Sequence, residues 1–116
     1  MKVNFHINLK EFDGTDAVEE KKVMLDGRVV TVKSPVIIND LVGKALYNGG
    51  GLERAGKADT DNDYRFKAYK LCQKIIASTG EIDLSPEELV MVKQAATIYS
   101  AAGVYAQIVE LVDPEK

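Results

Sequence analysis

Hydrophobic and polar residues alternate one by one at the start of the chain. Polar residues separate four apolar positions, which are Val3, Phe5, Ile7 and Leu9. A period of two is typical of a strand that buries one face. Asp13-Gly14 interrupts the alternation, so the sequence predicts a strand over about residues 3–9.

Two short stretches, residues 21–25 and 28–33, flank Asp26-Gly27. Asp-Gly readily takes the positive φ angles of a two-residue type I′ turn, which predicts a β-hairpin. Such a turn sets Val23 opposite Val30, a favourable cross-strand pair. We expect the hairpin and the first strand to form one three-stranded antiparallel sheet with one face to be covered.

The rest of the chain shows helical spacing of apolar residues in four stretches. Their approximate bounds are residues 35–47, 63–78, 86–99 and 101–112. Ser34-Pro35 is typical of a helix start, with serine as the N-cap and proline at the first helical position. Ser85-Pro86-Glu87-Glu88 adds a capping box to the same signal. The last two stretches form either one long helix or two helices with a break near Ser100 and Gly103.

Together these elements predict an α+β fold. A small N-terminal antiparallel sheet, made of a strand plus the Asp-Gly hairpin, is expected to pack against three or four helices. Residues 1–116 are expected to form a single domain, because 116 residues is an ordinary length for one. In the second helical stretch the apolar stripe comprises Tyr64, Ala68, Leu71, Cys72, Ile75 and Ile76.

Composition and charge narrow the choice of partners. The chain has 15 basic and 18 acidic residues and a net charge of −3. Nucleic-acid binding needs a basic surface, so nucleic acid is not an expected partner. Cys72 is the only cysteine, which excludes an internal disulfide and favours a reducing, cytoplasmic location. Residues 95–112 are mostly apolar, but Gln107 and Glu110 interrupt them, and we expect core packing and no membrane contact.

Catalytic and metal-binding chemistry finds little support in the residue types. His6 is the only histidine and falls on the polar side of the first strand, while Cys72 falls in an apolar helical stripe. One histidine and one cysteine make neither an activated nucleophile nor a zinc site. We therefore expect a protein that is not an enzyme, with no catalytic residues, no metal site and no cofactor.

Two degenerate motifs precede the second helical stretch. Residues 51–58 match the phosphate loop G-x-x-x-x-G-K-[ST] except at Ala58, which lacks the hydroxyl that binds Mg²⁺, and no strand leads into them. Residues 59–63 carry the alternating acids of an EF-hand, but Tyr64 stands where that loop needs glycine and Lys70 where it needs glutamate. The expected structure over residues 48–62 is a mobile loop, and the functional alternative is an anion cradle without hydrolysis.

A phosphate-bearing ligand would suit such a cradle and the basic residues that follow it. The candidate ligand-binding residues are Gly50, Gly51, Arg54, Lys57, Arg65, Lys67 and Lys70. Charged residues along one side of a helix commonly form only a solvated face, and that interpretation stays open.

The C-terminal segment offers a second kind of site. Small residues at positions 95–96 and 101–103 permit close helix approach, and tyrosines are frequent interface anchors. The candidate interface residues are Tyr99, Val104, Tyr105 and Ile108. This pattern favours a homo-oligomer, with ordinary core packing as the alternative.

The order of the elements resembles that of small accessory proteins encoded by phages and prophages. The resemblance rests on residues 3–10 with Asp13-Gly14, on the helix over residues 64–76, on residues 81–88 and on the apolar C-terminal end, so it covers most of the chain. It implies a protein that inhibits a host factor, such as a defence protein, or sequesters a signal in the host cytoplasm. These proteins mostly lack an assigned activity, so the resemblance carries over no functional residues.

We therefore expect a non-enzymatic binding protein. The first hypothesis is an oligomeric, phage-type inhibitor of a host protein. The alternative is a protein that sequesters a small phosphorylated ligand or nucleotide signal with the glycine-rich loop and the basic helix.

Overall fold

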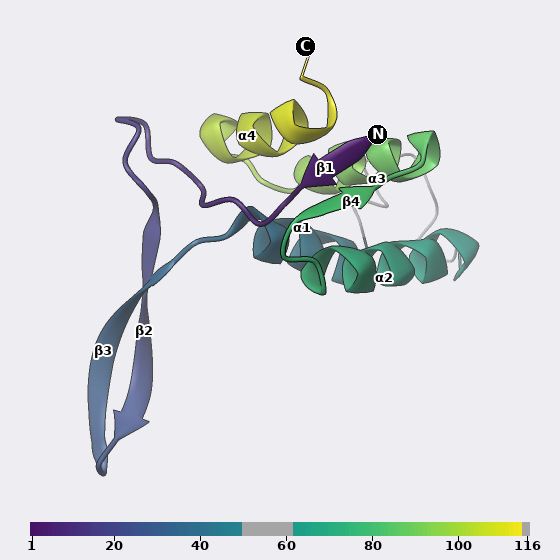
Figure 1. Cartoon of the computed structure of the whole chain (residues 1–116). Coiled ribbons are helices and arrows are strands. Elements are labelled where there is room, and N and C mark those ends of the chain that lie inside the picture. Colours follow the sequence, from purple (N-terminus) through teal and green to yellow (C-terminus); the bar gives the residue numbers. More distant parts are fainter. Residues whose placement is uncertain (50–61, 115–116) are drawn as a thin grey trace.

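A computed structural model of the chain describes residues 1–49 and 62–114 (Figure 1). The elements in these residues are β1 (Lys2–Asn4), β2 (Val18–Leu25), β3 (Arg28–Pro35), α1 (Ile38–Tyr47), α2 (Asn62–Ile76), β4 (Glu81–Asp83), α3 (Pro86–Ala96) and α4 (Ala102–Val112). The predicted α+β class is confirmed, since four helices accompany two small antiparallel sheets.

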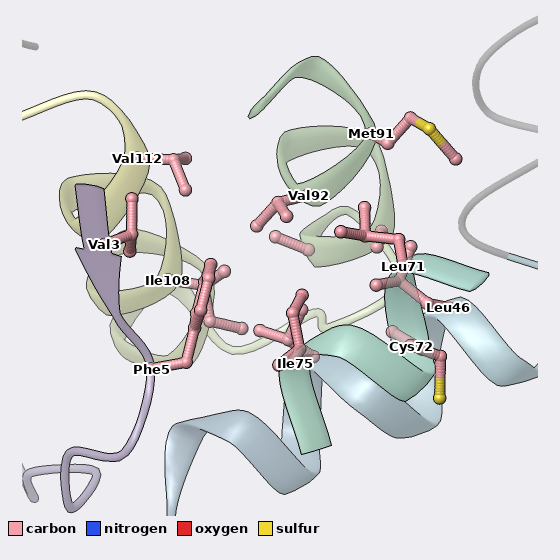
Figure 2. Close-up of a cluster of buried hydrophobic side chains, with 14 of the residues drawn as sticks. Val3, Phe5, Leu46, Leu71, Cys72, Ile75, Met91, Val92, Ile108 and Val112 are labelled. Carbon is pink, nitrogen blue, oxygen red and sulfur yellow. The ribbon is translucent and has the colours of Figure 1, made fainter. Parts of the chain in front are cut away.

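The core lies among the four helices and the first residues of the chain. α1 packs against α2 and α3, and α4 packs against α3 and β1. The largest fully buried side chains come from all of these segments, and they are Phe5, Val42, Leu46, Ile75, Val92 and Ile108. Figure 2 shows Val3 and Phe5 of the N-terminal segment in the same cluster as Ile75 and Ile108. The alternation at the start of the chain therefore buries its apolar side against helices.

The expected three-stranded sheet is wrong. β1 does not join the hairpin but pairs antiparallel with β4, with Val3 opposite Ile82. The Met1 amino group adds a 3.1 Å ion pair to Asp83, and the Leu84 N–H donates to the Met1 carbonyl at 2.8 Å. Period-two alternation predicts which face of a strand is buried but does not specify its neighbour, so a strand far away in the sequence could take that place.

The hairpin itself is confirmed. Asp26 and Gly27 have φ angles of 50° and 76°, which are the left-handed values that a type I′ turn requires. Val23 lies opposite Val30, as expected, and the paired strands are eight residues long on each side.

The predicted start of the first helix is also wrong. Ser34 and Pro35 end β3, and α1 begins only at Ile38, where Ile37 supplies no side-chain cap. A residue before proline is restricted to extended conformations, and proline is tolerated at the end of an edge strand. Both preferences favour the longer strand over the helix.

The observed bounds and buried residues of the other helices agree more closely with the sequence predictions. α2 buries Ala68, Leu71, Cys72 and Ile75 of the expected stripe, whereas Ile76 is half exposed. The sequence left open whether the C-terminal end forms one long helix or two. α3 ends at Ala96 and α4 begins at Ala102, so two helices are present.

The capping box at the start of α3 is confirmed. The Glu88 N–H donates to Ser85 Oγ at 3.2 Å, and the Ser85 N–H donates to Glu88 Oε1 at 2.8 Å. Lys74 of α2 lies 3.2 Å from the same carboxylate. Burial by itself raises the pKa of Glu88, but the hydrogen bonds from Ser85 and Lys74 outweigh burial, and the pKa falls below its ordinary value of 4.5.

This lowered pKa predicts a pH-dependent contribution to stability. A depressed carboxyl pKa stabilises the fold above the unfolded pKa of 4.5, and that contribution is lost as pH falls through the folded value. Glu88→Gln keeps an oxygen for the Ser85 N–H but removes the charge. Because Glu88 is only half-buried and Lys74 is exposed, the variant should lose about 0.5 kcal/mol of unfolding free energy at pH 7. Urea unfolding at several pH values should show this difference shrinking toward pH 3, with Glu110→Gln on the exposed side of α4 as the control substitution.

Candidate functional site: a projecting hairpin

The hairpin of β2 and β3 extends away from the helices (Figure 1). All eight residues of β2 are exposed, and in β3 only Val30 and Ser34 are even half-buried. Among the described residues, no helix packs extensively against either strand. We call residues 18–35 the arm.

The root of the arm is held by backbone hydrogen bonds to the N-terminal segment. The Ala17 N–H donates to the Leu9 carbonyl and the Leu9 N–H donates to the Val36 carbonyl, both at 2.8 Å. Asn8 Nδ2 donates to the carbonyls of Leu9 and Ala17 at 2.7 and 3.0 Å. Ala17 is buried, so the chain leaves the core at this residue.

Gln107 of α4 ties this root to the helices. Its Oε1 accepts from the Lys10 N–H at 2.8 Å, and its Nε2 donates to the Lys10 carbonyl at 2.9 Å. Sequence reasoning missed this role, because an isolated glutamine in a helix carries no signal for a contact so far away in the chain. The arm is therefore held in place at its root, while the residues beyond the root are exposed.

The two faces of the arm differ in chemistry. The cross-strand register places Lys21 with Val32, Val23 with Val30 and Leu25 with Arg28 on one face. This apolar face consists of Val23, Leu25, Val30 and Val32. The exposed fraction of its side chains reaches 60% at Leu25 and is 40% at both Val23 and Val32.

The opposite face is charged at its centre. Here Glu20 lies opposite Lys33 and Lys22 lies opposite Thr31. On this charged face, apolar pairs stand only at the two ends, with Met24 opposite Val29 near the turn and Val18 opposite Pro35 at the root.

An uncovered hairpin with an apolar face is unusual on physical grounds. A two-stranded hairpin is marginally stable in water unless its apolar face packs on something. Contiguous exposed apolar residues commonly mark an interaction site. The arm is therefore the strongest candidate site in the part of the chain that the structure describes.

A second exposed group lies beside the root of the arm. Phe12 is fully exposed on a turn in which the Gly14 N–H donates to the Glu11 carbonyl at 3.0 Å. Hydrogen bonds from the Thr15 hydroxyl and N–H hold the pKa of the Asp13 carboxyl below its usual value. The turn is thus well formed and presents an aromatic ring to solvent.

The predicted ligand-binding residues are only partly brought together. Gly50, Gly51, Arg54 and Lys57, together with most of the loop expected over residues 48–62, lie outside the described residues. Arg65 binds the Asn62 side chain at 2.5 Å, and Lys70 lies 5.5 Å from the ring centre of Phe66.

Lys67 already binds two carboxylates. Its amine lies 3.0 Å from Glu87 and 3.4 Å from Asp63, and the hydrogen bonds to Glu87 and Asp63 raise the pKa of Lys67. A phosphate in the hollow between α2 and α3 would have to compete with Glu87 and Glu88, which line it beside Lys67 and Lys70. The phosphate-ligand hypothesis stays a prediction.

The predicted interface residues lie on α4 and in the segment that precedes it, and they contact the core. Ile108 is fully buried, and Val104 and Tyr105 are half-buried against the core. The Tyr99 hydroxyl donates to the Leu41 carbonyl at 2.5 Å, and burial raises the pKa of Tyr99. These side chains pack within one chain, so the exposed apolar surface available to a second copy lies mainly elsewhere.

The single cysteine and histidine lie apart. Cys72 is buried between α1 and α2, where burial raises the pKa of its thiol. The His6 side chain is exposed. Over residues 1–49 and 62–114, no group of three or more His, Cys, Asp or Glu side chains could hold a metal ion. In the same residues, no helix is long and apolar enough to span a membrane.

Comparison with known proteins gives no match: no family model, no curated protein and no solved structure is similar to this chain. The arm and its surroundings are therefore the basis for the functional proposal.

Proposed function

We propose that the chain is a non-enzymatic binding protein that holds another polypeptide with its arm. The observation that carries the proposal is the apolar face of a hairpin with eight residues in each strand, none of them buried. Burial of Val23, Leu25, Val30 and Val32 against a partner would remove apolar surface from water, which is the main favourable term in protein association.

The anchoring of the arm supports this role. The Asn8 side chain binds the Ala17 carbonyl and Gln107 of α4 binds the Lys10 backbone, so the root of the arm is held in place before a partner arrives. A binding element that is positioned in advance loses less conformational entropy on association.

The chemistry of the reactive side chains supports a non-enzymatic role. Cys72 is the only thiol in the chain, and its burial disfavours the thiolate that a nucleophile needs. The phosphate-ligand alternative receives less support than the arm, because Lys67 and Lys74 already bind Glu87 and Glu88.

The resemblance to phage and prophage accessory proteins supports a more specific role. In that setting the bound polypeptide is a host protein, such as a defence factor, and binding inhibits it in the host cytoplasm. The exposed Phe12 beside the arm root is a natural second contact, since aromatic side chains are enriched among the residues that dominate binding energy.

Photo-crosslinking in bacterial cells tests the binding role. A photo-reactive amino acid in place of Val23 or Met24 should yield covalent adducts with polypeptides, because both side chains are exposed on the arm. The matched control replaces Ala106, which is exposed on α4. Mass spectrometry identifies each adduct. An arm that yields no more adduct than the control position contradicts the proposal.

A further inference from the structure

We propose that two copies of this chain associate through β3, whose exposed edge pairs antiparallel with the same edge of the second copy. The four strands of the two arms then form one continuous sheet. The inference goes beyond the proposed function, because it concerns the edge of the arm and leaves the apolar face free for another polypeptide.

The direction of the backbone groups in β3 follows from the ladder of the arm. The Val36 N–H donates to the Ala17 carbonyl at 3.1 Å, so this pair is hydrogen-bonded. Along an antiparallel ladder such pairs alternate with pairs that are not hydrogen-bonded, and the N–H and C=O groups of the latter point away from the partner strand. In the register of the arm, the outward-pointing residues of β3 are therefore Val29, Thr31, Lys33 and Pro35.

These outward groups are unpaired within residues 1–49 and 62–114. In that part of the chain β3 pairs with β2 alone, and no other group binds the N–H of Val29, Thr31 or Lys33. Pro35 has no N–H, so the row of donors ends at Lys33. A row of unpaired N–H and C=O groups is a template for one more extended strand.

The side chains distinguish the edge of β3 from the edge of β2. Residues 29–32 are valines and a threonine, which favour strands, whereas residues 19–22 of β2 are all charged. Charged side chains are a common means of keeping a strand edge unpaired. A two-fold axis at any of residues 19–22 also sets that residue opposite its own copy, so like charges meet, which is unfavourable. The edge of β3 is therefore the one that accepts a further strand.

A second β3 fits this edge best in one register. With a two-fold axis at Thr31, this residue lies opposite Thr31 of the second copy, and Val29 lies opposite Lys33. Each of these pairs exchanges two backbone hydrogen bonds, so the outward N–H groups of both edges all find a carbonyl. Moving the axis by one residue sets an outward residue opposite either the turn or Pro35, and part of these bonds is lost.

The side chains are compatible with this register on both faces. Thr31 faces Thr31, which is a favourable cross-strand pair. On the apolar face Val30 lies opposite Val32 of the second copy, and Arg28 lies opposite Ser34, so no like charges face each other. The valines of both arms then form one wider apolar surface, which is available to the polypeptide of the proposed function.

The shape of the molecule leaves room for this pairing. Because the arm extends away from the helices, antiparallel arms place the helices of the two copies at opposite ends of the joined sheet (Figure 1). β2 becomes the outer strand, where Lys21 keeps its 3.2 Å ion pair with Glu19. Four strands are also more stable than an isolated hairpin. The contact is smaller than the ~1,200 Å² that stable complexes bury, so the dimer dissociates on dilution.

A proline at the axis tests the backbone pairing. Thr31→Pro removes an outward N–H without removing a hydrogen bond between β2 and β3, and it should weaken the dimer at least about tenfold. Lys22→Pro is the matched control, because Lys22 lies opposite Thr31 and points outward at the other edge. The control should change the dissociation constant by less than about threefold. Sedimentation equilibrium measures each constant, and circular dichroism checks that each variant is folded.

Opposite charges at the axis test the two-fold symmetry without any change in the backbone. Thr31→Lys and Thr31→Glu should each dimerise at least about tenfold more weakly when alone, because each sets like charges directly opposite one another. An equimolar mixture of the two variants should associate with a dissociation constant within about threefold of the wild type, since the facing charges are then opposite.

Three results would overturn the inference. They are a wild-type chain that stays monomeric at all concentrations, a mixture that associates no better than its two components, and equal losses in Thr31→Pro and Lys22→Pro. All of these measurements use the purified chain alone. If photo-crosslinking at position 23 captures another polypeptide while the purified chain is monomeric, only this inference fails and the proposed function stands.

Discussion

Phe5→Ala should lower the free energy of unfolding by about 3–5 kcal/mol, the usual cost of removing a large buried ring. Phe5 is fully buried and belongs to the cluster that joins the N-terminal segment to the helices (Figure 2). Its removal leaves a cavity and loses apolar contacts together. Because domains of this kind are stable by only about 5–15 kcal/mol, the variant should be partly unfolded or close to it at 37 °C.

Phe12→Ala is the matched control for this loss. Phe12 has the same side chain but is fully exposed, so its replacement should change the unfolding free energy by less than about 0.5 kcal/mol. Urea unfolding followed by circular dichroism measures both variants. Equal losses for Phe5 and Phe12 would contradict the assignment of the N-terminal segment to the core.

Local sequence signals predicted most of the regular structure. Asp26-Gly27 specified the hairpin, Ser85 with Glu88 specified the start of α3, and the stripe around Leu71 specified the buried side of α2. In each case the signal depends on neighbouring residues only, through turn geometry, capping or helical spacing.

Pairing between distant segments could not be predicted in the same way. The partner of Val3 is Ile82, which is 79 positions away, and the three-residue strand that holds Ile82 has no pattern of its own. At Ser34-Pro35 two local preferences conflict, since the same dipeptide suits a helix start and a strand end. The strand prevailed there because β3 pairs with β2 as far as Pro35.

The exposure of the arm could not be predicted from its residue types. Val23, Val30 and Val32 have the composition of a buried strand face, so the sequence predicted a covering layer that the structure does not show over the arm. Conversely, Ile108 was a candidate interface residue, and it is fully buried within the same chain. Residue types alone cannot distinguish a face that is buried within a chain from one that is buried between chains.

The arm and the four helices should differ greatly in local stability. Amide hydrogens of α2 and α3 that lie over buried residues such as Ile75 and Val92 should exchange only through near-global unfolding. Amides of residues 18–35 depend on one two-stranded ladder, and no helix within residues 1–49 and 62–114 packs extensively over it, so their opening in the free chain should cost little. At micromolar concentration, arm amides should therefore exchange at least about 10³-fold faster than those of the core.

Hydrogen exchange followed by mass spectrometry measures this difference for the chain alone and with a partner identified by photo-crosslinking. If the partner covers the apolar face, protection of residues 18–35 should increase when it is added, because association stabilises the bound conformation by mass action. Protection over Ile75 and Val92 should not change, since those residues are already buried in one chain. Arm amides as protected as the core in the chain alone would mean that the hairpin is stable without a partner, and the physical reason for expecting an occupant on its apolar face would be lost.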